Sequence, residues 1–104
     1  MLNIVTTEND TQNVLGLFGR LDTSTAADLQ KTLMAQLELG KDVILDFKDL
    51  VYVSSAGLRV LLMGEKTAKS KDVSMKLKNV SEDIMEVFNM TGFASVLKFE
   101  EVAQ

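Results

Sequence analysis

With 104 residues and a formal net charge of −4, the chain can bury a core without disulfides, and we expect a single domain over residues 1–104 with no linker. It contains no His and no Cys, which excludes Ser-His-Asp triads, cysteine nucleophiles and histidine-based metal sites. Because the balance is acidic, the basic residues do not cluster and no apolar run could span a bilayer, we expect a cytoplasmic protein with no direct nucleic-acid binding and no membrane insertion.

The first predicted elements are two strands. Residues 2–6 alternate apolar and polar side chains, and residues 14–18 form a second apolar segment after a turn-forming Glu-Asn-Asp. A hairpin is the simplest connection between them. Residues 19–22 (Gly-Arg-Leu-Asp) then leave the sheet.

A helix follows this turn. Thr25 with Asp28 three residues later resembles a capping box. Four apolar residues share one helical face, which predicts an amphipathic helix: Ala26, Leu29, Leu33 and Leu37. Gly40 is placed to end it.

Residues 42–47 form a short apolar run, typical of a central strand that is buried on both faces. Within it, Asp46 fits a site residue and a cap for the next turn equally well.

Apolar residues recur at helical spacing from Leu58 onward, so a second helix begins near Ser54 or Ser55. A phosphate on a serine there would meet free amides and a favourable dipole, although an ordinary capped helix is the commoner interpretation.

The remaining elements alternate in the same way. Val73, Met75 and Leu77 predict a strand with one exposed face. Ser81 is expected to cap a third helix that ends at Gly92, and residues 96–99 predict a last short strand or an extended tail. The order predicts an α/β fold: a mixed four- to five-stranded sheet with helices packed chiefly on one face.

The segment Val-Ser-Ser-Ala-Gly-Leu-Arg at residues 53–59, together with residues 19–22 and the Ile-Leu-Asp-Phe strand at residues 44–47, resembles the STAS domain. This module is shared by bacterial anti-sigma factor antagonists and sulphate transporter tails, and the resemblance covers nearly the whole chain. The antagonists commonly carry Asp-Ser-Ser-Gly-Leu, with the phosphorylated serine two residues before the glycine. Anchored on Gly57, the resemblance implies phosphorylation of Ser55, with Ser54 as second choice. Ser54 occupies the place of the family's aspartate, and Ala56 that of its second serine.

The resemblance implies a phosphorylation-controlled binding module in bacterial signalling and transcription regulation. Unphosphorylated, it would bind a serine-kinase anti-sigma factor and release the sigma factor, and a metal-dependent serine phosphatase would reset it. Arg59 is expected either to meet the partner or to pair with Asp22 or the phosphate, and Leu58 and Arg59 are expected to be exposed or half exposed. The full set of expected partner contacts is Asp22, Ser54, Ala56, Gly57, Leu58 and Arg59.

The alternative function is a constitutive, non-phosphorylated STAS scaffold subunit of a larger signalling or transport assembly, which the missing aspartate at position 54 favours. An enzyme is not expected, because no glycine-rich motif matches a dinucleotide or phosphate-binding loop. A Ser55–Lys66 dyad would be separated by about 16 Å of helical rise. We therefore expect no catalytic residue, cofactor or metal.

Overall fold

The computed structural model describes residues 1–100. Within them lie five strands, three α-helices and one short 3-10 helix. In chain order the elements are β1 (Leu2–Glu8), β2 (Gln12–Leu21), α1 (Ala26–Glu38), β3 (Asp42–Val53), α2 (Ser55–Ser70), β4 (Met75–Lys78), α3 (Glu82–Thr91), η1 (Phe93–Ser95) and β5 (Lys98–Phe99).

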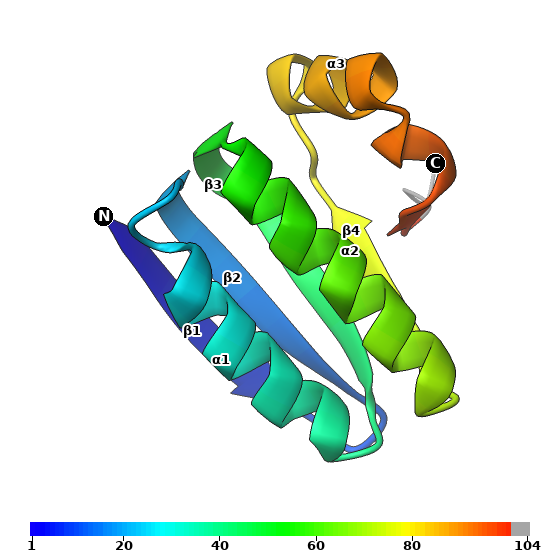
Figure 1. Ribbon diagram of the computed structural model, residues 1–104. Coiled ribbons are helices and arrows are strands. Elements are labelled where there is room, and N and C mark those ends of the chain that lie inside the picture. The colour runs from blue at the N-terminus through cyan, green and yellow to red at the C-terminus, as the bar shows by residue number, and fades with distance from the viewer. Residues whose placement is uncertain (101–104) are drawn as a thin grey trace.

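The strands form one mixed sheet in the order β1-β2-β3-β4-β5. β1 and β2 pair antiparallel as a hairpin, and every later neighbour pairs parallel. Helices α1 and α2 lie side by side on one face of this sheet, while α3 lies beyond the end of β3 (Figure 1). The predicted α/β fold with helices chiefly on one face is confirmed.

The core lies between the sheet and the helices α1 and α2. The four residues predicted for the buried face of α1 are all buried there, and Leu45 at the centre of β3 is inaccessible to solvent. Gly64 allows α2 to approach its neighbours closely, because a Cβ at this position would lie 2.7 Å from Leu33 Cδ2 and 2.7 Å from Met75 Sδ. No helix in residues 1–100 combines the length and hydropathy that crossing a membrane requires.

The two central strands are longer than predicted. β2 continues to Leu21 instead of leaving the sheet at Gly19, and β3 continues to Val53 instead of ending at Phe47. The register between them shifts twice, so that β3 carries an extra residue at each shift. These β-bulges interrupt the alternation of buried and exposed residues, which is why the sequence pattern predicted shorter strands.

The predicted capping box at the start of α1 is wrong. Thr25 occupies the N-cap, but its side chain makes no capping hydrogen bond within the helix. The Thr25 hydroxyl instead donates to the Arg20 carbonyl oxygen over 2.8 Å and accepts from the Asp22 amide over 2.9 Å. It thereby holds the loop between β2 and α1 against the end of β2.

We predict that Leu33→Ala lowers the free energy of unfolding by about 2–5 kcal/mol, because Leu33 is fully buried and its removal leaves a cavity. Leu39→Ala, at the end of the same helix, is the matched control: Leu39 is 58% exposed, so its loss should change the free energy by less than about 0.5 kcal/mol. Urea unfolding followed by circular dichroism measures both. Equal losses in the two variants would contradict the packing described here.

Candidate functional site

The serine turn, which we define as residues 54–59, joins β3 to α2. Ser54 is the N-cap of α2, with extended backbone angles, and its Oγ accepts a hydrogen bond from the Gly57 amide over 3.2 Å. Ser55 is the first residue of the helix. Of the two serines that the sequence left open as the cap, the structure therefore selects Ser54. Its hydroxyl is engaged and half-buried, whereas the Ser55 side chain is exposed.

Leu21 fixes the position of this turn. The Ser54 amide donates to the Leu21 carbonyl oxygen over 2.8 Å, continuing the ladder that pairs Leu21 with Val53. Gly57 packs directly on the same residue, because a Cβ there would lie 2.7 Å from Leu21 Cγ and 3.1 Å from the Leu21 oxygen. The serine turn and the Asp22 loop that follows Leu21 thus lie on one rim of the molecule.

The exposed residues of the serine turn lie on one face of α2. Arg59 is exposed and lies four residues after Ser55, so the two side chains share one face of the helix. Ala56 is half-buried beside them. Arg59 is thereby placed where it can reach a group attached to the Ser55 hydroxyl.

Two of the expected contact residues lie beneath this surface. Leu58 is only 6% exposed and belongs to the hydrophobic core, so the expectation of an exposed or half-exposed Leu58 is wrong. Gly57 is buried against Leu21. Leu58 lies on the same helical face as Leu61 and Ala68, and this face packs against the core. Both residues therefore anchor the serine turn to the core.

Asp22 is held by the loop that it begins. Its Oδ1 accepts hydrogen bonds from the Ser24 hydroxyl over 2.7 Å, the Ser24 amide over 3.0 Å and the Thr25 amide over 3.1 Å. The hydrogen bond from the Ser24 hydroxyl is the largest cause that lowers the pKa of Asp22 below its usual value of 3.8. Asp22 is therefore a fixed negative charge on the rim at neutral pH.

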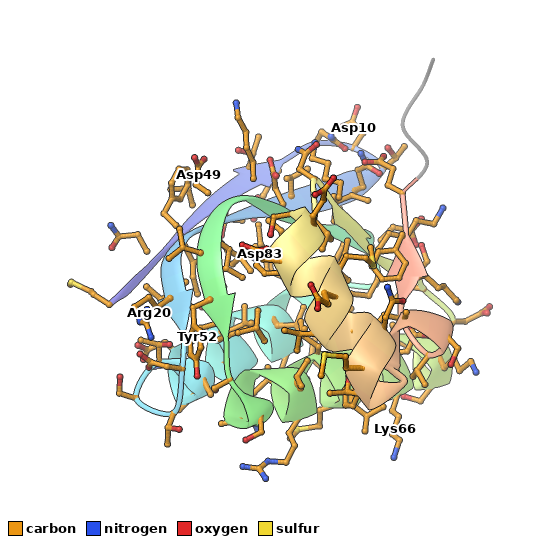
Figure 2. All side chains as sticks on the ribbon, turned by 90° about the horizontal axis from the view of Figure 1, so that it is seen from above. Asp10, Arg20, Asp49, Tyr52, Lys66 and Asp83 are labelled. Atoms are coloured by element: carbon orange, nitrogen blue, oxygen red, sulfur yellow. The ribbon has the colours of Figure 1, made fainter. Side chains whose placement is uncertain are left out.

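Arg20 and Tyr52 form a pair that the sequence did not reveal. The Arg20 guanidinium carbon lies 4.3 Å from the centroid of the Tyr52 ring, which is a cation–π arrangement. Figure 2 shows the two side chains next to each other at the ends of β2 and β3. Arg20 Nε also lies 3.8 Å from Asp22 Oδ2, so Arg20 takes the place near Asp22 that was considered for Arg59.

The sequence left two roles open for Asp46, a site residue or a cap for the next turn. In the structure its side chain binds the backbone of the same strand and a neighbouring segment. Its Oδ1 accepts from the Lys48 amide and from the Asn79 side-chain amide, each over 3.0 Å. It thereby stabilises the first bulge of β3 and ties it to the segment after β4. Residues 1–100 contain no group of three or more carboxylate, His or Cys side chains arranged to hold a metal ion.

Comparison with known proteins places this geometry among related domains. A model of the STAS domain matches residues 3–104. The anti-sigma-B factor antagonist of Bacillus subtilis is 29% identical over 96 residues, which cover 92% of this chain and 88% of that protein. BtrV of Bordetella bronchiseptica is 36% identical over 81 residues, which cover 77% of this chain and 70% of that protein.

Solved structures share the fold at lower sequence identity. An anti-sigma factor antagonist from Mycobacterium paratuberculosis has a TM-score of 0.83 at 16% identity, with 98% of this chain and 87% of that chain covered. The Bacillus cell fate determinant SpoIIAA in its phosphorylated form has a TM-score of 0.72 at 18% identity, with 97% and 92% covered. The arrangement of helices and strands is thus common to these chains.

We predict that Ser24→Ala raises the pKa of Asp22 toward 3.8, because the largest stabilising hydrogen bond to the carboxylate is lost. A carboxyl group whose pKa is lower in the folded state than in the unfolded state stabilises the fold at pH values above its unfolded-state pKa. This stabilisation is lost as the pH falls through the folded-state pKa. The variant should therefore lose less stability than the wild type on acidification below about pH 4. NMR titration of the Asp22 carboxyl carbon measures the shift. Thr23→Ala, one residue away and exposed, is the control and should leave that pKa unchanged.

We predict that Gly57→Ala lowers the free energy of unfolding by about 1–3 kcal/mol, because the new methyl group would overlap Leu21 and its backbone oxygen. Gly64→Ala is the matched control within α2. Its methyl group would meet side-chain atoms of Leu33 and Met75 but no backbone atom, so the loss should be smaller. Chemical denaturation compares the two. A neutral Gly57→Ala would contradict the role assigned to Leu21.

Proposed function

The chain belongs to the STAS domain family, and on this premise we propose that it is an anti-sigma factor antagonist controlled by phosphorylation of Ser55. In the unphosphorylated form it binds a serine-kinase anti-sigma factor, which then releases its sigma factor. The name of the Bacillus subtilis relative, an anti-sigma-B factor antagonist, supports the class of partner. The proposed site of action is the cytoplasm.

One observation carries the choice of serine. The Ser54 hydroxyl already caps α2 through the Gly57 amide, whereas the Ser55 side chain is exposed at the first helical position. A kinase must reach the hydroxyl that it modifies, and at Ser55 it can do so without breaking the cap. Modification of Ser54 would remove a capping interaction that is typically worth about 1 kcal/mol.

A phosphate on Ser55 fits the structure of the unbound domain. It adds a charge of about −1.5 to −2 at the amino end of a helix, where amides of the first turn and the dipole favour an anion. Arg59, four residues along the same face, supplies a cation within one turn. We therefore propose that phosphorylation leaves the fold intact and acts on binding.

The partner would meet a different surface after phosphorylation. We propose that it contacts Ser54, Ser55, Ala56 and Arg59, together with Asp22 on the same rim. Before modification, the centre of this surface is small and neutral. Afterwards the partner must desolvate an anion close to the fixed charge of Asp22, which weakens the complex. A serine phosphatase would restore binding by removing the phosphate.

The scaffold alternative predicts a different chemical state of the same residues. In a constitutive STAS subunit neither serine is modified, and the small polar Ser54 in place of the family's aspartate is the feature that supports it. The two functions are distinguished by the chemistry of Ser55 and by the effect of a negative charge there. They require no difference in fold.

We predict that peptide mass spectrometry of the chain purified from its native cells finds a single phosphate on Ser55. Immobilised wild type and Ser55→Ala should capture the same kinase from a native lysate, whereas Ser55→Asp should capture it at least about tenfold less well. Lys66→Asp is the control: it adds negative charge to the same helix about three turns from Ser55, so capture should persist. Unmodified serines under several stress conditions, with equal capture by Ser55→Asp, would refute the switch and support the scaffold.

A further inference from the structure

The face of the sheet opposite α1 and α2 has no helix over it within residues 1–100 (Figures 1 and 2). Directly opposed residues of paired strands point to the same side of a sheet. Phe18 opposes Asp49, and Arg20 opposes Tyr52. Because Phe18 and Arg20 are two residues apart on β2, all four side chains lie on this face. We call these four residues the open-face patch.

Large apolar side chains are exposed around this patch. Phe18 and Tyr52 are each 41% exposed, Val51 is 71% exposed and Val5 is 54% exposed. Val5 opposes Gly16, against which the Phe18 ring packs, so it lies on the same face. Contiguous exposed apolar surface with polar groups at its border is typical of protein–protein contact sites.

A bulge in β3 produces this arrangement. The register shifts between Gly19 and Arg20, so Val51 is an extra residue on β3. Val51 and Tyr52 are consecutive, yet both are exposed, which regular alternation does not allow. The bulge thereby brings Tyr52 beneath the Arg20 guanidinium. Bulges redirect side chains in this way near functional surfaces.

The two charges of the open-face patch are of opposite sign. Arg20 Nε is 3.8 Å from Asp22 Oδ2, which is longer than a hydrogen bond, so the guanidinium keeps donors for another carboxylate. Asp49 is exposed on the neighbouring strand, and Figure 2 shows it extending away from the helices. A surface that carries both a cation and an anion can bind a second copy of itself, because a two-fold axis presents each charge to the other.

We propose that the open-face patch is the interface of a symmetric homodimer, in which Arg20 of each copy binds Asp49 of the other. The strand register defines the axis. The four residues form a rectangle in which Arg20 and Asp49 lie on one diagonal, and Phe18 and Tyr52 on the other. A two-fold axis along the diagonal from Phe18 to Tyr52 places Arg20 of one copy opposite Asp49 of the other. Each of these aromatic residues then packs on its own counterpart. Because the axis is oblique to the strands, the two sheets cross steeply, as in orthogonal sheet packing.

Charge reversal tests this interface in the full chain. Sedimentation velocity from micromolar to millimolar protein should show a reversible monomer–dimer equilibrium. Arg20→Asp and Asp49→Arg should each raise the dimer Kd at least about tenfold, because like charges then face each other. The double variant restores both opposite pairs and should recover most of the lost affinity.

Two matched reversals at exposed helical sites are the controls. Lys66→Asp on α2 and Glu86→Arg on α3 change the net charge as much, yet both residues lie on helices away from the open-face patch, so the Kd should stay near that of the wild type. NMR spectra establish that each variant is folded. A wild type that stays monomeric, or a dimer that both single reversals leave intact, overturns the proposal. Ser55→Ala should dimerise normally, so this result is independent of the proposed phosphorylation switch.

Discussion

The contact between Gly57 and Leu21 determines the geometry of the serine turn. Leu21 ends β2, accepts a hydrogen bond from the Ser54 amide and leaves no space for a side chain at position 57. The first turn of α2 is therefore seated on the ends of the two longest strands. Since Asp22 follows Leu21 directly, the same contact places a fixed carboxylate beside the serines. The ends of β2 and β3 thus position the serine turn and the loop that begins at Asp22.

The hydrophobic pattern predicted the elements wherever its period is constant. The helical face of α1 and the alternation in β4 follow from side-chain spacing alone. The pattern failed in β3, where two bulges change which residues face the core. At Leu58 the pattern and the expectation disagreed: Leu58 begins the apolar series of α2 and is buried with it, whereas exposure was expected because Leu58 was counted among the partner contacts.

The remaining site features depend on pairing between distant segments. The serine turn is contiguous in sequence, so its residues could be singled out directly. Arg20 and Tyr52 become neighbours only through the register of β2 on β3, and that register includes a bulge. The loop hydrogen bonds that hold Asp22 form among adjacent residues, yet Thr25 turns back to the Arg20 carbonyl instead of capping α1. Local propensity does not determine this choice, because it requires the end of β2 to be in place.

In the proposed switch, the serine at position 54 provides the helix cap without the negative charge that an aspartate would add. Ser and Asp are both effective N-caps, and the Ser54 hydroxyl makes the capping hydrogen bond that a carboxylate would otherwise make. A carboxylate there would stand next to a phosphate on Ser55 and repel it. Because position 54 is a serine, the carboxylate near the turn is that of Asp22 on the adjoining loop. Arg59 lies one helical turn after Ser55 on α2. The helix therefore keeps its cap while residues 54–58 carry no charge, and in the proposed switch the added negative charge comes from Ser55 alone.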